Sequence, residues 1–205
     1  MSQGHYFDPS PAVRDRPGEV YLPVGDERLP LHTDAGVFSK GKIDRGTRLL
    51  LAAMERGSLA LPEDGDVCDL GCGYGPIGIA VAKMRPKTRV YMVDINPRAV
   101  ELAERNVRRH RLGNVQVRRG DGVSVFAPQR FDLIITNPPI RAGKAQVHAL
   151  LTEAKEWLVP GGRLALVIRT QQGAKSLAAF LETLFPVVEE IEKGGGFRVY
   201  EAQRT

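Results

Sequence analysis

Cysteine is scarce in this 205-residue sequence, which contains only two, and long apolar runs are missing. Two cysteines are too few for the disulfide framework that stabilises many small secreted domains. No segment reaches the roughly 20 consecutive apolar residues with which a helix spans a membrane. The first ten residues are polar and lack the apolar segment of a signal peptide. We therefore expect a cytoplasmic protein without a membrane segment.

The composition excludes disorder or a coiled coil as a description of the whole chain. Hydrophobic residues make up 42% and charged residues 26% of the sequence, as in ordinary globular domains. The formal net charge of +5 permits a polyanionic partner without requiring one. The length suggests one domain of about 150 residues with an extension. We expect an N-terminal arm, a possible hairpin and a capping helix over residues 1–58, and the main domain over residues 59–205.

Short apolar runs alternate with helical patterns from Asp66 onward. We predict strands over residues 67–70, 89–93, 115–117, 131–136 and 163–168, and helices that begin near residues 76, 97, 144 and 174. Repeated β-α-β units indicate a parallel sheet with helices on both faces. Residues 187–192 and 197–202 are two more strand-like runs, joined by a short glycine-rich turn that cannot hold the crossover that parallel strands need. We predict an antiparallel hairpin at the edge of the sheet.

The N-terminal part of the chain supports two further predictions. Residues 19–24 and 28–33 flank a Gly-Asp pair, which favours a hairpin, although prolines in both runs suit only edge strands. Residues 45–56 have a helical pattern, with Asp44 as a candidate N-cap and Gly57 as the expected C-terminal stop.

The segment from Asp69 to Gly78 is the most informative, because a buried strand leads through several glycines into a helix that starts near Pro76. Such a loop lies at the carboxyl edge of an open α/β sheet, where ligands bind, and glycines let a ligand approach closely. Gly73-x-Gly75-x-x-Gly78 satisfies the weak dinucleotide pattern. Asp69 argues against a pyrophosphate, which a carboxylate repels, and no Lys-Ser/Thr pair follows as in a phosphate-binding loop. A tight turn without a ligand is the simplest alternative.

Two more acidic residues follow the next two predicted strands. Asp94 ends a strand about 20 residues after the glycines, which is the spacing of a residue that accepts hydrogen bonds from ribose hydroxyls. Its alternative role is to cap the helix that begins at Pro97. Asp121 lies between Gly120 and Gly122, where it could accept a hydrogen bond from an adenine amine or belong to a plain turn.

Together, the glycine segment, Asp94 and Asp121 resemble the S-adenosylmethionine site of class I methyltransferases. The resemblance extends from about residue 66 to the C-terminus. It implies an α/β fold with a doubly wound, Rossmann-like seven-strand sheet, an antiparallel C-terminal hairpin and a short N-terminal extension. The cofactor would be S-adenosyl-L-methionine, whose positive sulfonium suits acidic neighbours. The residues expected to contact it are Asp69, Gly71, Cys72, Gly73, Asp94, Ile95, Asp121, Gly122 and Asn137.

No Cys or His spacing in the sequence suggests a metal site.

Asn137-Pro138-Pro139 follows the apolar strand at residues 131–136 and is the clearest sign of a reaction. The prolines restrict the backbone, so we expect the Pro138 carbonyl oxygen to be held rigidly near the Asn137 side-chain oxygen. Two acceptors match the two N–H donors of a planar amine and would aim its lone pair at a methyl group. Alignment and electrostatics would then supply the rate without a strong base. The alternative is an ordinary turn. The catalytic motif resembles that of methyltransferases that act on amino nitrogens of adenine, guanine or glutamine.

Neighbouring residues narrow this resemblance. Ile140 stands where adenine- and glutamine-specific members have an aromatic residue, and Phe38 is either a replacement that stacks on a flipped base or a core residue. Residues 33–40, 44–50 and 137–144 are similar to the small-subunit (16S) ribosomal RNA guanine-N2 methyltransferase family, especially its short single-domain bacterial members. This resemblance implies ribosomal RNA or the small ribosomal subunit as the partner. The residues expected to contact the substrate are Phe38, Lys40, Ile140, Arg141 and Lys144.

Three alternative functions stay open at this point. The same motif could methylate a protein glutamine or a small-molecule amine, and activity that survives ribonuclease treatment would favour that function. A non-catalytic module could bind RNA or a protein and keep the cofactor pocket as a relic, although the retained Asp69, Asp94 and Asn137 argue against it. A nicotinamide-dependent dehydrogenase is the weakest alternative. The sequence does not indicate the oligomeric state.

Overall fold

The structure is a computed structural model and describes residues 17–34 and 41–205, so the predicted substrate contacts Phe38 and Lys40 lie outside the described residues. The strands are β1 (Pro17–Val24), β2 (Glu27–Asp34), β3 (Asp66–Leu70), β4 (Arg89–Asp94), β5 (Val115–Arg119), β6 (Phe131–Thr136), β7 (Leu158–Arg169), β8 (Val187–Gly194) and β9 (Phe197–Gln203). The α-helices are α1 (Arg45–Arg56), α2 (Pro76–Met84), α3 (Pro97–Arg109), α4 (Lys144–Glu156) and α5 (Ala174–Leu184). Short 3₁₀ turns are η1 (Val123–Phe126), η2 (Ile140–Ala142) and η3 (Thr170–Gln172). None of the helices in these two ranges is long and apolar enough to cross a membrane.

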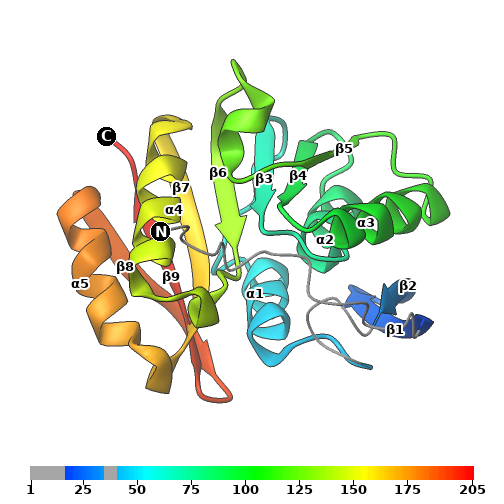
Figure 1. The fold of residues 1–205 in the computed structure, drawn as a ribbon, viewed down its shortest axis with the longest axis horizontal. Coiled ribbons are helices and arrows are strands. Elements are labelled where there is room, and N and C mark those ends of the chain that lie inside the picture. The colour runs from blue at the N-terminus through cyan, green and yellow to red at the C-terminus, as the bar shows by residue number, and fades with distance from the viewer. Residues whose placement is uncertain (1–16, 35–40) are drawn as a thin grey trace, which may run out of the picture.

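Seven strands form one sheet in the order β5-β4-β3-β6-β7-β9-β8 (Figure 1). The five strands from β5 to β7 in that order run parallel, and β9 is antiparallel to both β7 and β8. Gly195 and Gly196 alone connect β8 to β9. This arrangement confirms the predicted fold, including the C-terminal hairpin at the edge of the sheet.

The largest difference between a predicted and an observed strand is in β7. β7 spans Leu158–Arg169, whereas the prediction covered residues 163–168 only. Gly161 N donates to Arg204 O at 2.9 Å, and Arg204 N donates to Gly162 O at 2.8 Å. The glycines therefore do not end the strand, because the C-terminus of the chain continues to pair with them.

Helices α1, α2 and α3 cover one face of the large sheet, and α4 and α5 cover the other (Figure 1). Successive side chains of a strand point to opposite faces. In β3, which is buried throughout, Val67 packs in the cluster under α1 to α3, and Cys68 packs in the cluster under α4 and α5. A strand covered on both faces is mostly apolar, which explains the apolar runs, although β3 also buries Asp66 and Asp69.

The N-terminal hairpin forms a separate two-stranded antiparallel sheet, as predicted. β1 contacts α2, and β2 contacts α3. Leu22 and Leu31 are fully buried in the same cluster as these helices. Asn106 of α3 accepts from His32 N at 2.7 Å and donates to His32 O at 2.9 Å. The hairpin thus packs on helices α2 and α3.

A domain boundary at residue 58 stays a prediction.

Helix α1 begins and ends as the sequence predicts. Asp44 Oδ2 accepts a hydrogen bond from Thr47 N at 3.0 Å, and Gly57 ends the helix in a left-handed conformation with φ of 79°. The arrowhead of β6 points toward α1 in Figure 1. The first turn of α1 therefore lies at the carboxyl edge of the sheet.

Candidate functional site

The loop between β3 and α2 turns against the end of β4. Gly71 N and Cys72 N both donate to Val93 O at 2.9 Å. Gly71 and Gly73 have φ values of 75° and 56°, which residues with a Cβ rarely adopt. A Cβ at either position would meet nothing within 4 Å among the described residues. The glycines therefore leave open space beside the loop.

Asp69 is buried beneath this loop and is 1% exposed. Its Oδ2 accepts from Gly78 N at 2.8 Å, while its Oδ1 is buried and has no hydrogen-bond partner among the described residues. Burial raises the pKa of Asp69 to about 7, and the negative charge of Asp94 adds to the rise. A buried acceptor without a donor is costly, so this oxygen is suited to a positively charged donor from a ligand.

Asp94 joins two of the loops at the carboxyl edge. Its Oδ2 accepts from Gly73 N at 2.8 Å, and its Oδ1 accepts from Asn96 N at 2.9 Å. Burial raises the pKa of Asp94, although these backbone hydrogen bonds act to lower it. The N-cap of α3 is Asn96, which accepts from Arg98 N at 3.0 Å. Asp94 is therefore not that cap and stands as a half-buried acid beside the glycine loop.

Asp121 lies in the loop after β5. Gly120 N donates to Asp94 O at 3.1 Å, so this loop lies beside the other two. Asp121 is exposed, and the neighbouring Gly122 lies against the carboxylate of Glu153, with which an added Cβ would collide. Glu153 comes from α4 and was not predicted, because no local signal connects it with a loop some 30 residues earlier.

Cys72 and Ile95 are the two remaining predicted cofactor contacts. Burial raises the pKa of the Cys72 thiol well above its ordinary value, so this group stays protonated. Ile95 follows Asp94 and is half-buried. Both residues lie in the loops at the carboxyl edge, where they can contribute backbone and apolar contacts.

Asn137 stands at the end of β6, and its amide group has a defined orientation. Its Nδ2 donates to Asp44 Oδ2 at 2.9 Å and to Thr47 Oγ1 at 3.1 Å, both in the first turn of α1. The preceding Thr136 donates its hydroxyl to Leu70 O at 2.7 Å, which fixes the end of β6 beside the end of β3. Because both amide hydrogens have partners, the Asn137 oxygen is the atom left to contact a ligand.

The carbonyl of Pro138 is held by a tight turn. Pro139 has φ of −75° and ψ of 77°, the values of an inverse γ-turn. Ile140 N closes this turn by donating to Pro138 O at 2.8 Å. The carbonyl oxygen has a second lone pair that can still accept a hydrogen bond.

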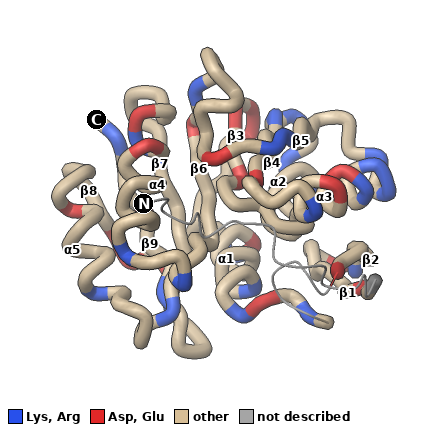
Figure 2. The backbone as a smooth tube through the Cα atoms, in the orientation of Figure 1, with Lys and Arg blue, Asp and Glu red and all other residues tan. Residues whose placement is uncertain are grey.

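The predicted substrate contacts after the prolines lie in η2 and at the start of α4. Ile140 is half-buried and packs on the cluster under α4 and α5. Arg141 and Lys144 are exposed. Figure 2 shows basic residues on both sides of the carboxyl end of β6, in the segment that leads into α4 and at the start of α1. Arg141 and Lys144 therefore add positive charge near the end of β6, whereas the charged group in direct contact with Asn137 is the Asp44 carboxylate.

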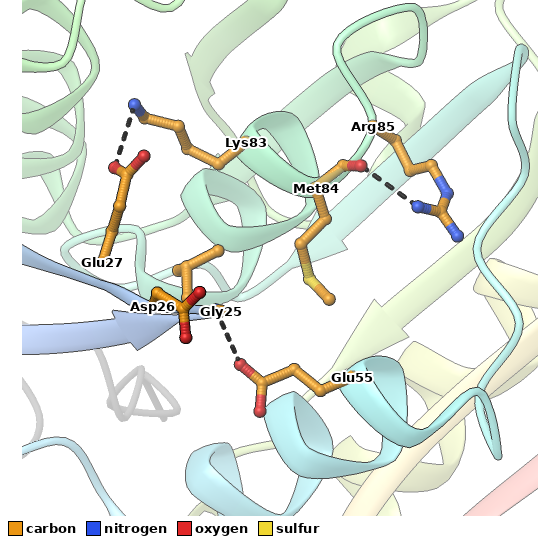
Figure 3. Close-up of a pocket in the computed structure, with 8 residues that line it drawn as sticks. Gly25, Asp26, Glu27, Glu55, Lys83, Met84 and Arg85 are labelled. Atoms are coloured by element: carbon orange, nitrogen blue, oxygen red, sulfur yellow. Dashed lines mark hydrogen bonds and ion pairs between the residues drawn. The ribbon is translucent and has the colours of Figure 1, made fainter.

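One cavity lies away from these residues. It measures about 560 Å³ and is lined by the β1–β2 turn and the C-terminal end of α2 (Figure 3). Two interactions link its charged residues to their surroundings: Lys83 pairs with Glu27 at 3.5 Å, and Glu55 accepts from Gly25 N at 3.1 Å. The C-terminal end of α2 is opposite to the end that carries the glycine loop, so this cavity is not part of the site.

Comparison with known proteins agrees with this arrangement. A model of the methyltransferase small domain matches residues 28–201. The chain therefore belongs to the methyltransferase small domain family, and it is an S-adenosylmethionine-dependent methyltransferase.

Three relatives define its position within the family. The uncharacterized protein YbxB of Bacillus subtilis is 37% identical over 203 residues, which are 98% of each chain. Ribosomal RNA small subunit methyltransferase C of Pseudomonas aeruginosa is 34% identical over 90% of this chain and 54% of the relative. The structure of a T. thermophilus 16S rRNA N2 G1207 methyltransferase, in complex with AdoMet and guanosine, has a TM-score of 0.79 and 25% identity over 95% of this chain and 52% of its own. The chain thus spans about half the length of these two ribosomal RNA methyltransferases.

Proposed function

We propose that the protein transfers a methyl group from S-adenosylmethionine to the exocyclic N2 amine of a guanine in small-subunit ribosomal RNA. The orientation of the Asn137 amide carries the proposal, because it leaves an acceptor oxygen for an amine N–H. The P. aeruginosa relative supports small-subunit ribosomal RNA as the target, and the T. thermophilus structure supports the N2 position of a guanine in it. The net charge of +5 suits a polyanionic substrate. With this substrate, the protein works in the cytoplasm.

The residues around the glycine loop fit the cofactor. The unpartnered Oδ1 of Asp69 would accept a hydrogen bond from the ammonium group of the methionine part. Asp94 would accept from the ribose hydroxyls and Asp121 from the adenine amine. The remaining contacts are assigned to Gly71, Cys72, Gly73, Ile95 and Gly122.

Catalysis rests on alignment of the amine. Bound S-adenosylmethionine supplies a methyl group on a sulfonium that leaves as a neutral thioether. Asn137 Oδ1 and Pro138 O accept the two N–H groups of the amine, and its lone pair then faces the methyl group. The nitrogen becomes positive as the new bond forms, and the two acceptor oxygens stabilise its N–H groups. One proton then passes to water, so no strong base is needed.

Asp44 and Thr47 are positioning residues for this step. A reversed Asn137 amide would turn its N–H groups toward the amine, and two donors would face each other. The same reversal would place the Asn137 oxygen against the Asp44 carboxylate, which now accepts its Nδ2 at 2.9 Å. Asp44 therefore selects the orientation in which Asn137 presents its oxygen.

Methyl transfer from labelled S-adenosylmethionine to RNA from cells that lack this gene tests the proposal. We expect label in small-subunit RNA, released as N2-methylguanosine, and no label after ribonuclease treatment. Label in a protein or a small amine that survives ribonuclease would contradict the RNA substrate and favour the glutamine or small-amine alternative. Cofactor binding without transfer to RNA, assembled subunits or other amines would contradict an enzymatic role and favour a non-catalytic binding module.

A further inference from the structure

A second cavity, of about 440 Å³, opens at the carboxyl edge of the sheet. The glycine loop and Asp94 follow β3 and β4, on one side of β6 in the strand order. The cavity lies on the other side of β6, at the end of β7 and the turn before β9. Asn137 at the end of β6 therefore separates the cofactor side of the edge from the cavity.

The cavity adjoins the proposed amine site directly. Asp44 lines it, and the same Asp44 carboxylate accepts from Asn137 Nδ2 at 2.9 Å. Thr170 N donates to Gly196 O at 2.8 Å, which joins the end of β7 to the turn before β9 beneath the opening. A molecule whose amine contacts Asn137 can therefore extend into this cavity.

The cavity is lined by groups that bind nucleotides. Arg45 and Arg169 are exposed, and neither has an ion-pair partner within residues 17–34 and 41–205. Asp44 supplies the opposing charge, and its Oδ2 is already engaged by Thr47 N and Asn137 Nδ2. Guanidinium groups bind phosphate oxygens through paired N–H donors. The two arginines are thus free to bind one phosphate.

Phe197 supplies an aromatic surface in the same cavity. It is half-buried, and a Cβ added to Gly46 would lie 3.2 Å from its ring, so the backbone of α1 supports one side of the ring. Aromatic rings stack on bases of single-stranded RNA. Gln171 adds an amide that can both donate and accept hydrogen bonds.

We propose that this cavity binds the nucleotide next to the methylated guanine, with its phosphate at Arg45 and Arg169 and its base or ribose against Phe197. The proposal rests on the proposed function and adds a subsite to it. The volume is within the range of about 300–1,000 Å³ that is usual for small-molecule sites. The cavity lies beside the amine site and on the side opposite to the glycine loop, so a neighbouring nucleotide could occupy it without displacing the cofactor.

Paired substitutions in the full-length protein test this subsite. Arg45→Gln with Arg169→Gln removes both guanidinium groups, and Arg48→Gln with Lys175→Gln removes the same charge from exposed residues that do not line the cavity. We expect the first pair to raise KM for small-subunit RNA about tenfold or more, with unchanged cofactor affinity, and the control pair to change it less than about twofold. The dependence of RNA affinity on salt should weaken by about one unit of slope per lost phosphate contact.

Equal effects of the two pairs on KM would overturn the proposal, because they would reflect net charge alone. A wild-type KM in the Arg45 and Arg169 variant would also overturn it. If the wild-type protein methylates a protein and not RNA, the proposed function itself fails, and an acidic peptide becomes the ligand to test in the cavity. The wild-type assay therefore separates the two failures.

Phe197 provides a second, independent test. Phe197→Tyr keeps the ring, whereas Phe197→Leu keeps apolar volume and loses stacking. We expect the leucine variant to raise KM for RNA about fivefold or more and the tyrosine variant to stay close to wild type, because stacking depends on the ring. Equal KM values for folded leucine and tyrosine variants would contradict the stacking role.

Discussion

The two sides of the carboxyl edge hold their polar groups in different ways. On the glycine-loop side, Asp69 and Asp94 accept hydrogen bonds from backbone N–H groups 9 and 21 residues away. On the other side, the Asn137 amide is held by two side chains, those of Asp44 and Thr47, 93 and 90 residues earlier. The first arrangement forms within one β-α-β unit, whereas the second requires α1 to pack on the sheet.

This difference predicts that the two sides can be disabled separately. Changes on the glycine-loop side should weaken cofactor binding with little effect on the amine. Changes around Asn137 should slow methyl transfer with little effect on cofactor binding. A variant on the glycine-loop side that slows methyl transfer at saturating cofactor, or a variant around Asn137 that weakens cofactor binding, would contradict this separation.

The largest effect is expected from Asn137→Ala. It removes one of the two acceptors that we propose align the amine, and loss of one such preorganised group costs about 10²- to 10³-fold in turnover. We expect cofactor affinity to stay within about twofold of wild type, since the site on the other side is unchanged. Single-turnover methyl transfer and calorimetry measure the two quantities. Unchanged turnover would refute the role of the amide.

Asp94→Ala should have the next largest effect, on the other side. The substitution removes the proposed carboxylate acceptor for the ribose and releases the N–H of Gly73. Hydrogen bonds to charged groups contribute about 1.5–3 kcal/mol each, so cofactor affinity should fall about 100-fold. Turnover at saturating cofactor should stay close to wild type. Asp64→Ala, at an exposed residue away from the loops, is the matched control.

Substitutions of Asp44 sharpen the comparison, because they test the orientation of Asn137 without touching the amine. Asp44→Ser keeps an N-cap hydroxyl for Thr47 N but is too short to reach Asn137, and we expect turnover to fall about tenfold, equivalent to ~1.4 kcal/mol. Asp44→Asn keeps an acceptor of the same length and should restore most of the turnover. Melting temperatures and cofactor affinity should be similar in both. Equal loss of turnover in the serine and asparagine variants would contradict the positioning role.

The smallest expected effect is the pH dependence of cofactor affinity, which we expect Asp69 on the glycine-loop side to cause. The pKa of Asp69 is raised to about 7 from a model-compound value of 3.8, mainly by burial. A cationic ligand group prefers the ionised carboxylate, so cofactor affinity should rise with pH up to about 7 and then level off. Below pH 7 it should fall up to about tenfold per pH unit. In Asp69→Asn this part of the pH dependence should disappear, which calorimetry at pH 6, 7 and 8 can show. An unchanged pH profile in the asparagine variant would contradict ionisation of Asp69 as the cause.

The fold and the position of the glycine loop beside Asp94 could be predicted from the sequence because their signals are local. Residues close in the chain determine three of these features. They are the strand that precedes the glycines, Asp94 at the end of the next strand, and the cap of α1. The same is true of the glycine turn that joins β8 and β9. The extra length of β7 was missed, because its glycines are kept in the strand by Arg204, which lies far along the sequence.

On the Asn137 side of the carboxyl edge, the sequence predicted individual residues but not the contacts between them. Asp44 was predicted as a helix cap and Asn137 as a catalytic residue, yet no pattern indicated that they touch. The cavity likewise combines Arg45, Arg169 and Phe197 from three separate segments. Contacts of this kind depend on how α1 packs across the sheet, and periodicity and spacing do not encode that packing.

A double-mutant cycle of Asp94→Ala and Asn137→Ala is the most direct test of the separation between the two sides. We predict that the double variant has the cofactor affinity of Asp94→Ala and the turnover, at saturating cofactor, of Asn137→Ala. The coupling free energy should then be below about 0.5 kcal/mol in both quantities. A coupling above about 1 kcal/mol, or a cofactor affinity lowered as much by Asn137→Ala as by Asp94→Ala, would contradict it.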